Sequence, residues 1–102
     1  MPIQKRFLKS KPVCKATFMF PKELAGDAKR VNLVGDFNNW NRENHTMKKL
    51  KNGSFKIILD LPVGREFQYR YLIDSERWEN DPEADKYIQA PYPGIDNSII
   101  IT

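Results

Sequence analysis

The sequence predicts an all-β, immunoglobulin-like antiparallel sandwich of about six to eight strands. Short runs rich in β-branched and aromatic residues recur along the chain, and Gly, Pro, Asn and Asp clusters separate them. Long amphipathic helices do not alternate with these runs, as they would in a fold built on a parallel sheet. The best helical candidate, residues 22–29, is short and is interrupted by Gly26.

The first half of the chain contains three expected strands. Residues 15–21 (KATFMFP) have strand-forming composition and end at a proline. Residues 30–36 (RVNLVGD) place Val31 and Leu33 on one face. Residues 54–61 (SFKIILDL) follow the dipeptide Asn-Gly, which is a strong signal for a hairpin turn.

The second half begins with the clearest alternation, in residues 66–74 (EFQYRYLID). One face carries Phe67, Tyr69, Tyr71 and Ile73, and the other carries Gln68, Arg70 and Leu72. The aromatic face is expected in the core. A polar turn at residues 74–77 returns the chain to Trp78. Asp81-Pro82 begins a loop that is expected to run to about Asn97, and residues 98–102 (SIIIT) form the last strand.

The length of 102 residues fits one domain, expected over residues 14–102. Residues 1–13 form a basic leader or edge segment. The first 22 residues hold six basic and no acidic side chains, whereas the remainder has slightly more acidic than basic ones. Such a leader could bind a polyanion, or it could be a solvated tail or an edge strand protected by lysine. Nucleic acid is not the expected partner, because aromatic residues do not interleave with the basic ones.

Residue composition also bounds the location of the protein. The sequence has no run of 18 apolar residues and no apolar segment typical of a signal peptide, so we expect neither a membrane span nor secretion. Cys14 is the only cysteine and cannot form an internal disulfide, which fits a reducing compartment. The expected location is therefore the cytoplasm.

Catalysis is not expected from the residues present. A single histidine, His45, and a single cysteine make a zinc site improbable, and no Gly-rich phosphate motif occurs, so no metal or cofactor is expected. Glycoside hydrolysis needs two carboxylates held across a cleft. Glu79, Asp81 and Asp85 could be nominated, but a lone sandwich of this size rarely encloses a substrate.

Three aromatic residues lie where a core has no obvious need of them. Trp40 follows Asn38-Asn39, Trp78 follows a polar turn, and Tyr92 lies between two prolines. An indole held on a turn presents a flat apolar face with a polar N–H edge, which suits the apolar face of a sugar ring. Both tryptophans could instead fill the core, as tryptophans often do in sandwiches. Arg70 and Asn97 are candidate hydrogen-bond partners for sugar hydroxyls, although arginine is more often only a surface charge.

The sequence also resembles a known family through several short motifs in the same order. These motifs are GDFNNW at residues 35–40, LDLPxG at 59–64, YRYLID at 69–74, WxxDP at 78–82 and NS at 97–98. They are similar to carbohydrate-binding module family 48. Its members include the glycogen-binding domain of the AMP-activated protein kinase β subunit and the N-terminal early-set domain of isoamylases and branching enzymes.

The resemblance implies non-catalytic binding of α-1,4-glucan, that is, glycogen, starch or a maltooligosaccharide. It places the two platform tryptophans on Trp40 and Trp78, a basic hydroxyl partner on Arg70 where the family has lysine, and an asparagine on Asn97. The loop that contributes a further contact in the kinase module corresponds here to residues 89–96 (QAPYPGID), where Tyr92 or Ile95 lies nearest to that contact. The alternative is a sandwich that docks onto a glucan-metabolising enzyme or a kinase-like partner without binding sugar itself.

Overall fold

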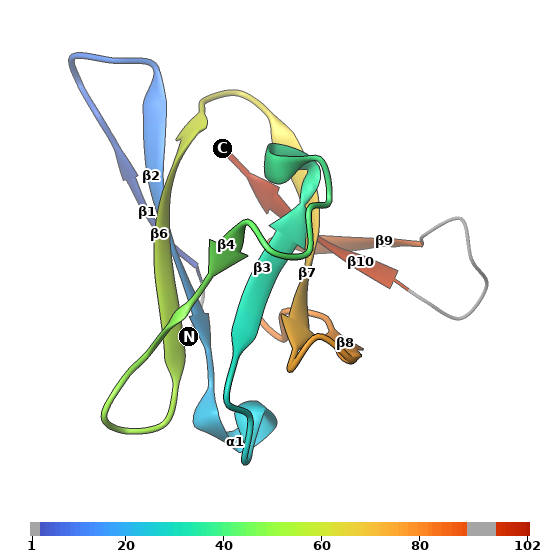
Figure 1. The fold of residues 1–102 in the computed structure, drawn as a ribbon. Coiled ribbons are helices and arrows are strands. Elements are labelled where there is room, and N and C mark those ends of the chain that lie inside the picture. Colours follow the sequence, from blue (N-terminus) through green and yellow to red (C-terminus); the bar gives the residue numbers. More distant parts are fainter. Residues whose placement is uncertain (1–2, 90–95) are drawn as a thin grey trace.

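The fold is a sandwich of two antiparallel sheets, with four strands in one and six in the other (Figure 1). The structure is a computed structural model, and it describes residues 3–89 and 96–102. Turns and loops join the strands, and the single α-helix among the described residues, α1 (Lys22–Ala25), is one turn long. The predicted immunoglobulin-like β-sandwich is confirmed.

The four-stranded sheet has the order β1-β2-β6-β5. The strands are β1 (Gln4–Phe7), β2 (Val13–Phe20), β6 (Phe55–Pro62) and β5 (Lys48–Lys49). β2 and β6 are the two inner strands of this sheet, and they pair along their whole lengths from Val13↔Pro62 to Phe20↔Phe55. β1 lies on the edge of β2, so part of the basic leader is a strand.

The six-stranded sheet has the order β4-β3-β7-β10-β9, and β8 pairs with the second half of β7. The strands are β3 (Val31–Gly35), β4 (His45–Thr46), β7 (Glu66–Ile73), β8 (Arg77–Glu79), β9 (Lys86–Gln89) and β10 (Asp96–Ile101). β7 is central, since it pairs with β3 on one side and with both β10 and β8 on the other.

The strand count exceeds the expectation, because ten strands lie in the described part of the chain. β4 and β5 have two residues each, too few to show a period in the sequence. The expected loop from Asp81 to about Asn97 is wrong in part, since β9 lies within it. All four β9 residues are exposed, so this edge strand lacks the apolar–polar alternation by which strands are recognised.

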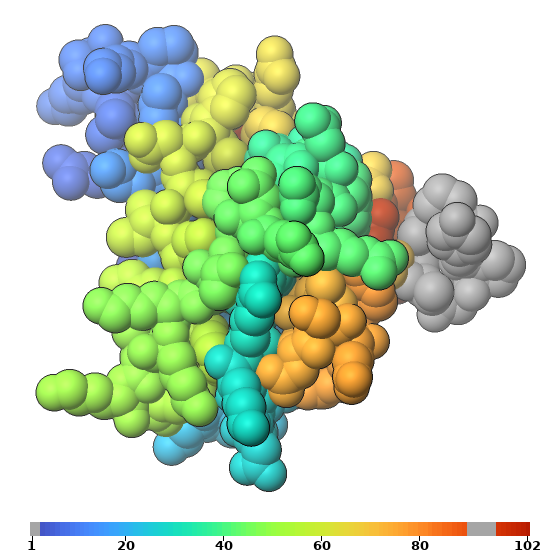
Figure 2. All heavy atoms as spheres, viewed as in Figure 1, coloured from blue at the N-terminus to red at the C-terminus, as the bar shows by residue number. Residues whose placement is uncertain are grey.

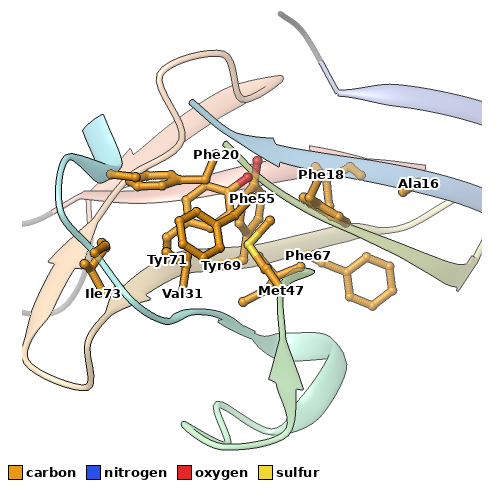
Figure 3. Close-up of a cluster of buried hydrophobic side chains, with 14 of the residues drawn as sticks. Ala16, Phe18, Phe20, Val31, Met47, Phe55, Phe67, Tyr69, Tyr71 and Ile73 are labelled. Carbon is orange, nitrogen blue, oxygen red and sulfur yellow. The ribbon is translucent and has the colours of Figure 1, made fainter. Parts of the chain in front are cut away.

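The core fills the space between the sheets and is rich in aromatic rings (Figure 3). Phe18 packs edge-on against Tyr69 with ring centroids 5.2 Å apart, and Phe20 lies 4.8 Å from Tyr71. Offset and edge-to-face ring pairs of this kind stabilise a core beyond their area burial. The aromatic face predicted for β7 is confirmed as the core face, and Cys14 is fully buried.

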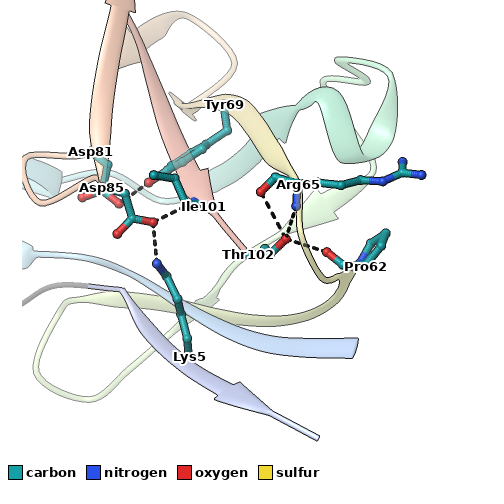
Figure 4. Close-up of polar contacts among 8 residues, drawn as sticks. All are labelled: Lys5, Pro62, Arg65, Tyr69, Asp81, Asp85, Ile101 and Thr102. Carbon is teal, nitrogen blue, oxygen red and sulfur yellow. Dashed lines mark hydrogen bonds and ion pairs between the residues drawn. The ribbon is translucent and has the colours of Figure 1, made fainter. Parts of the chain in front are cut away.

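Contacts at the strand ends join the two sheets (Figure 4). Lys5 of β1 forms an ion pair of 2.6 Å with Asp85, and the same Asp85 oxygen accepts a hydrogen bond of 2.7 Å from the Ile101 N–H. The Thr102 hydroxyl donates to the Pro62 carbonyl at 2.6 Å. One positive charge of the leader, that of Lys5, is therefore paired within the fold. The described residues contain no helix of the length and apolar character needed to cross a membrane.

Candidate functional site

Trp40 is held by a tight turn at the end of β3. A 3₁₀ turn, η1 (Asp36–Asn38), follows the strand, and the Trp40 N–H donates to the Gly35 carbonyl at 2.9 Å. Asn39 and Trp40 both have positive φ angles, 55° and 58°. A bulky residue in this region is an outlier that the surrounding structure must hold in place, and such outliers cluster at functional sites.

The side chain of Asn38 fixes this turn from inside. Its Oδ1 accepts a hydrogen bond from the Gly35 N–H at 3.1 Å, and its Nδ2 donates to the Leu33 carbonyl at 3.0 Å. The same Nδ2 lies 2.7 Å from Nδ1 of His45. Because the two backbone bonds fix which end of the amide donates, His45 Nδ1 must be the acceptor. His45, which belongs to β4, therefore supports the turn.

Asp36 connects the Trp40 indole to strand β7. Asp36 Oδ1 accepts a hydrogen bond of 2.8 Å from Trp40 Nε1, and Oδ2 accepts one of 2.8 Å from the Gln68 N–H. The indole is half-buried and belongs to neither the core nor its lining. Its polar edge is therefore fixed by a carboxylate, while part of its ring stays accessible beside β7.

Three side chains on the outer face of β7 and β10 form a hydrogen-bonded row. Arg70 Nε donates to Asn97 Oδ1 at 2.6 Å, and Asn97 Nδ2 donates to Gln68 Oε1 at 2.8 Å. Asn97 is 5% exposed, so its amide orients Arg70 and Gln68 and is not itself freely presented. The two terminal nitrogens of Arg70 have no hydrogen-bond partner among residues 3–89 and 96–102 and remain as donors.

Arg70 keeps its positive charge although it is partly buried. Burial lowers the pKa of Arg70, and the neighbouring Asp96 raises it again in part. A guanidinium remains protonated under all ordinary conditions, so Arg70 is a cation with fixed donors.

Trp78 lies on the same face, farther along β7. It pairs with Leu72, and the Arg42 guanidinium carbon lies 5.5 Å from the centroid of its ring. Trp78 is half-buried and, like Trp40, is outside the core. The segment that carries Arg42 follows Trp40, and this segment and β8 adjoin on one side of the molecule, where they are green and orange (Figure 2).

Buried apolar side chains lie beside the row of polar side chains. Val34, Leu72 and Ile99 are 0–3% exposed, yet none belongs to the core cluster between the sheets. The strand register places Val34 beside Arg70, Ile99 beside Gln68, and Leu72 beside Trp78. These buried apolar residues support the polar row, whereas the half-buried indoles of Trp40 and Trp78 are the apolar groups that stay accessible.

Asn80 ties the strand of Trp78 to the strand of Asn97. Its Nδ2 donates to the Asp96 carbonyl at 2.7 Å, and its Oδ1 accepts from the Ser98 hydroxyl at 2.8 Å. The Ser98 oxygen also accepts from the Asp81 N–H at 2.8 Å. These contacts fix the end of β8 against the start of β10, so they set the positions of both Trp78 and Asn97.

The Asp81 carboxylate is buried and has a structural role. Asp81 Oδ2 accepts hydrogen bonds from the hydroxyls of Tyr69, at 2.8 Å, and Tyr71, at 3.1 Å. The Tyr87 hydroxyl donates to the Asp81 carbonyl. Burial raises the pKa of both core tyrosines, and the negative charge of Asp81 raises them further. A carboxylate engaged in this way holds the core to β8 and is poorly placed for catalysis.

The structure thus brings together four of the five predicted site residues. Arg70, Asn97 and Trp78 lie on the outer face of the six-stranded sheet, Trp40 is tied to that sheet through Asp36 and the Gln68 N–H, and Tyr92 lies outside the described residues. Sequence reasoning missed Asp36, Gln68 and Arg42. Only Gln68 gave a signal, because it alternates onto the same face as Arg70. Among the described residues, no group of three His, Cys, Asp or Glu side chains is arranged to hold a metal ion.

The chain matches a known protein family. The profile of carbohydrate-binding module 48, the isoamylase N-terminal domain, matches residues 16–92, which is most of the chain. The chain belongs to this family. A carbohydrate-binding module of this kind is a non-catalytic domain, and membership therefore assigns this sandwich to binding.

Similar curated proteins are 1,4-α-glucan branching enzymes. The enzyme of Shewanella sp. (strain MR-4) is 35% identical over 72 residues, which are 67% of this chain and 10% of that protein. The Mesorhizobium japonicum enzyme is 38% identical over 50 residues, 47% of this chain and 7% of that protein. The Candida glabrata enzyme is 54% identical over 39 residues, 37% and 6% respectively. The matched part of the chain thus spans about a tenth or less of these relatives.

Proposed function

We propose that this module binds α-1,4-glucan of the glycogen and starch type on the outer face of its six-stranded sheet. Trp40 and Trp78 stack on sugar rings, and the terminal nitrogens of Arg70 donate to sugar hydroxyls. Gln68 and Asn97 orient the guanidinium. The observation that carries the proposal is that both indoles lie outside the core, with Trp78 opposite Leu72 and Trp40 tied through Asp36 to the Gln68 N–H on the strand that presents Arg70.

The spacing of these groups suits an oligosaccharide better than a single sugar. The Trp40 side is anchored at Gln68, and Trp78 pairs with Leu72, four residues farther along β7. Four residues of strand span roughly 13 Å. A ligand that contacts both indoles therefore needs several linked sugar rings, as maltooligosaccharides and glycogen branches provide.

The acidic side chains near Trp40 and Arg70 favour a neutral ligand with many hydroxyls. The Asp36 carboxylate lies beside Trp40, and Asp96 lies near Arg70, so acidic groups accompany the arginine. A strongly anionic ligand would meet both carboxylates. Binding of a neutral glucan is expected to depend little on salt. The expected dissociation constant is on the order of 10 µM to 1 mM, about −7 to −4 kcal/mol, because the surface is open and the contacts are few.

The test is a titration with β-cyclodextrin and maltoheptaose, followed by tryptophan fluorescence and amide chemical shifts. Saturable binding is expected, with roughly a tenfold or greater loss in Trp40→Ala and in Trp78→Ala. Ile58→Ala is a control for loss of an exposed apolar side chain, because Ile58 lies on the other sheet. Normal affinity in both tryptophan variants, with the fold retained, would exclude this face as the site.

A second function is a docking role on a glucan-metabolising enzyme. It is favoured by the relatives, of which the matched region forms about a tenth and which are named as branching enzymes. In that case Trp40 and Trp78 would be interface anchors. No binding of either sugar at several millimolar would support docking over sugar binding.

The buried free thiol of Cys14 is consistent with a reducing compartment, so we place the module in the cytoplasm.

A further inference from the structure

Strand β6 has an open edge along residues 57–61. Its other edge pairs with β2 over all eight residues, whereas β5 covers the open side only at Lys48↔Lys56 and Lys49↔Phe55. Just before β5 the chain is still bonded to the other sheet, because the Met47 N–H donates to the Val31 carbonyl of β3 at 2.8 Å. Within the described residues, no strand lies beside the rest of this edge. Figure 1 shows β4 and η1 of the other sheet facing it.

The register indicates which backbone groups face the open edge. The Leu50 N–H donates to the Ser54 carbonyl at 2.7 Å, so this pair is the hydrogen-bonded kind. In an antiparallel ladder such pairs recur at every second residue. Lys56 therefore directs its N–H and C=O toward β5, and Ile58 and Asp60 direct theirs outward. Unpaired groups of this kind are a template for an added strand.

Two hollows follow one another along this edge. One, of about 480 Å³, is lined by Phe37 and His45 on one side and by Leu59 and Leu61 on the other. The second, of about 400 Å³, is lined by Leu50 and Ile57 together with Lys48 and Lys56. Ile58 lines both hollows and is 48% exposed. Hollows that follow one another along an open edge can take side chains of an extended peptide, which is how such peptides are selected.

The charge beside this edge is positive. Lys48 and Lys56 lie directly opposite each other in the register, and like charges in that arrangement are unfavourable. Neither lysine forms an ion pair within the described part of the chain. The one acid on this stretch, Asp60, lies 3.9 Å from Lys15. A carboxylate from outside would relieve the repulsion between Lys48 and Lys56.

We propose that the β6 edge is a docking site for an extended acidic segment of a partner protein. The segment adds as a strand beside residues 57–61, its backbone pairs with Ile58 and Asp60, and its carboxylates lie between Lys48 and Lys56. This surface is on the four-stranded sheet, apart from the face that carries Trp40 and Trp78. Lysines at a strand edge can also serve only to prevent aggregation. That role does not account for the hollows along the edge or for an exposed Ile58 at its centre.

The test uses a capped octapeptide in which valine alternates with glutamate, added to the ¹⁵N-labelled protein. Saturable shifts are expected at the amides of Ile58 and Asp60, with new contacts between the peptide backbone and β6. Lys48→Glu combined with Lys56→Glu should weaken this peptide roughly five- to tenfold and favour a matched peptide in which valine alternates with lysine. Lys9→Glu with Lys29→Glu makes the same change in charge away from the edge and should leave binding unchanged.

Three results would overturn the proposal. Equal binding of the acidic and basic peptides would show that charge does not select the partner. Shifts confined to other strands, or none at several millimolar peptide, would show that the β6 edge is not a template. Shifts at Ile58 that grow with protein concentration alone would assign the edge to a second copy of the chain. Trp40→Ala should bind the peptide like the original protein, which separates this test from that of glucan binding.

Discussion

The Arg42 guanidinium lies over the indole of Trp78, 5.5 Å from the ring centroid. Arg42 follows Trp40 by two residues, so the segment after one proposed platform covers part of the other. A cation over an indole is attracted by the electron-rich ring face, by about 0.5–1 kcal/mol at an exposed site. A sugar ring stacking on the same face would have to displace the guanidinium. The proposed glucan site is therefore partly covered by a side chain of the protein itself.

Replacing Arg42 by glutamine is expected to strengthen glucan binding roughly two- to fivefold, because the competing cation–π contact is lost. Isothermal titration with maltoheptaose measures this change, and tryptophan fluorescence of the free protein should change as well. Arg65→Gln is the matched control, since Arg65 is exposed and lies in the turn before β7, away from both indoles. Weaker binding in Arg42→Gln would instead show that Arg42 contacts the sugar.

Asp36→Ala tests whether the Trp40 indole is held by the carboxylate. The change leaves the Gln68 N–H and Trp40 Nε1 without their acceptor, so we expect a loss of about 1–3 kcal/mol in the free energy of unfolding and weaker glucan binding. Urea unfolding and the same sugar titration measure the two effects. Asp60→Ala removes an exposed acid with only a 3.9 Å ion pair and should change stability by less than about 0.5 kcal/mol. Equal losses in the two variants would disprove the anchoring role.

Much of the fold could be predicted because it depends on local patterns. The alternation in residues 66–74 predicted which side chains of β7 enter the core and, by exclusion, that Gln68 and Arg70 face outward. The Asn-Gly turn predicted the strand that begins at Phe55. These signals work because neighbouring strand residues face opposite sides of a sheet. β9 gave no such signal, because an exposed edge strand needs no apolar face.

The connections within the site could not be predicted in the same way. Asp36 meets the Gln68 N–H, and Asn97 meets Arg70, across long stretches of sequence. The sequence indicated Asn97 as a free partner for hydroxyls, yet its amide is already used to orient its neighbours. Contacts of this kind depend on strand register, which short motifs do not specify. The cation–π contact of Arg42 depends in addition on the path of the chain after Trp40.

Asp81→Ala is expected to destabilise the fold by about 3–5 kcal/mol, because the hydroxyls of Tyr69 and Tyr71 then lack their buried acceptor. Chemical denaturation measures the loss. In a background of Tyr69→Phe with Tyr71→Phe, the same change should be much less costly, since no hydroxyl is left unpaired. The same loss in both backgrounds would show that the carboxylate acts through other contacts, such as its bond from the Glu83 N–H.

The two core tyrosines also predict how stability falls in alkali. Their pKa values in the folded state are raised above 10 by burial and by Asp81, whereas in the unfolded chain they ionise near 10. Below about pH 10 both states hold these protons, and the stabilisation is fully present. As pH rises further the unfolded state alone loses them, so the free energy of unfolding should fall by about 1.4 kcal/mol per pH unit for each tyrosine.

Denaturant unfolding between pH 9 and pH 11 measures this slope, and tyrosinate absorbance shows when the protons leave. The double variant Tyr69→Phe and Tyr71→Phe should lose most of the slope, while lysines and the other tyrosines contribute equally to both proteins. Tyr87→Phe is a control for the loss of a tyrosine hydroxyl outside the core, because Tyr87 is 46% exposed. The same slope in the double variant as in the original protein would mean that Tyr69 and Tyr71 ionise in the folded state as easily as in the unfolded chain.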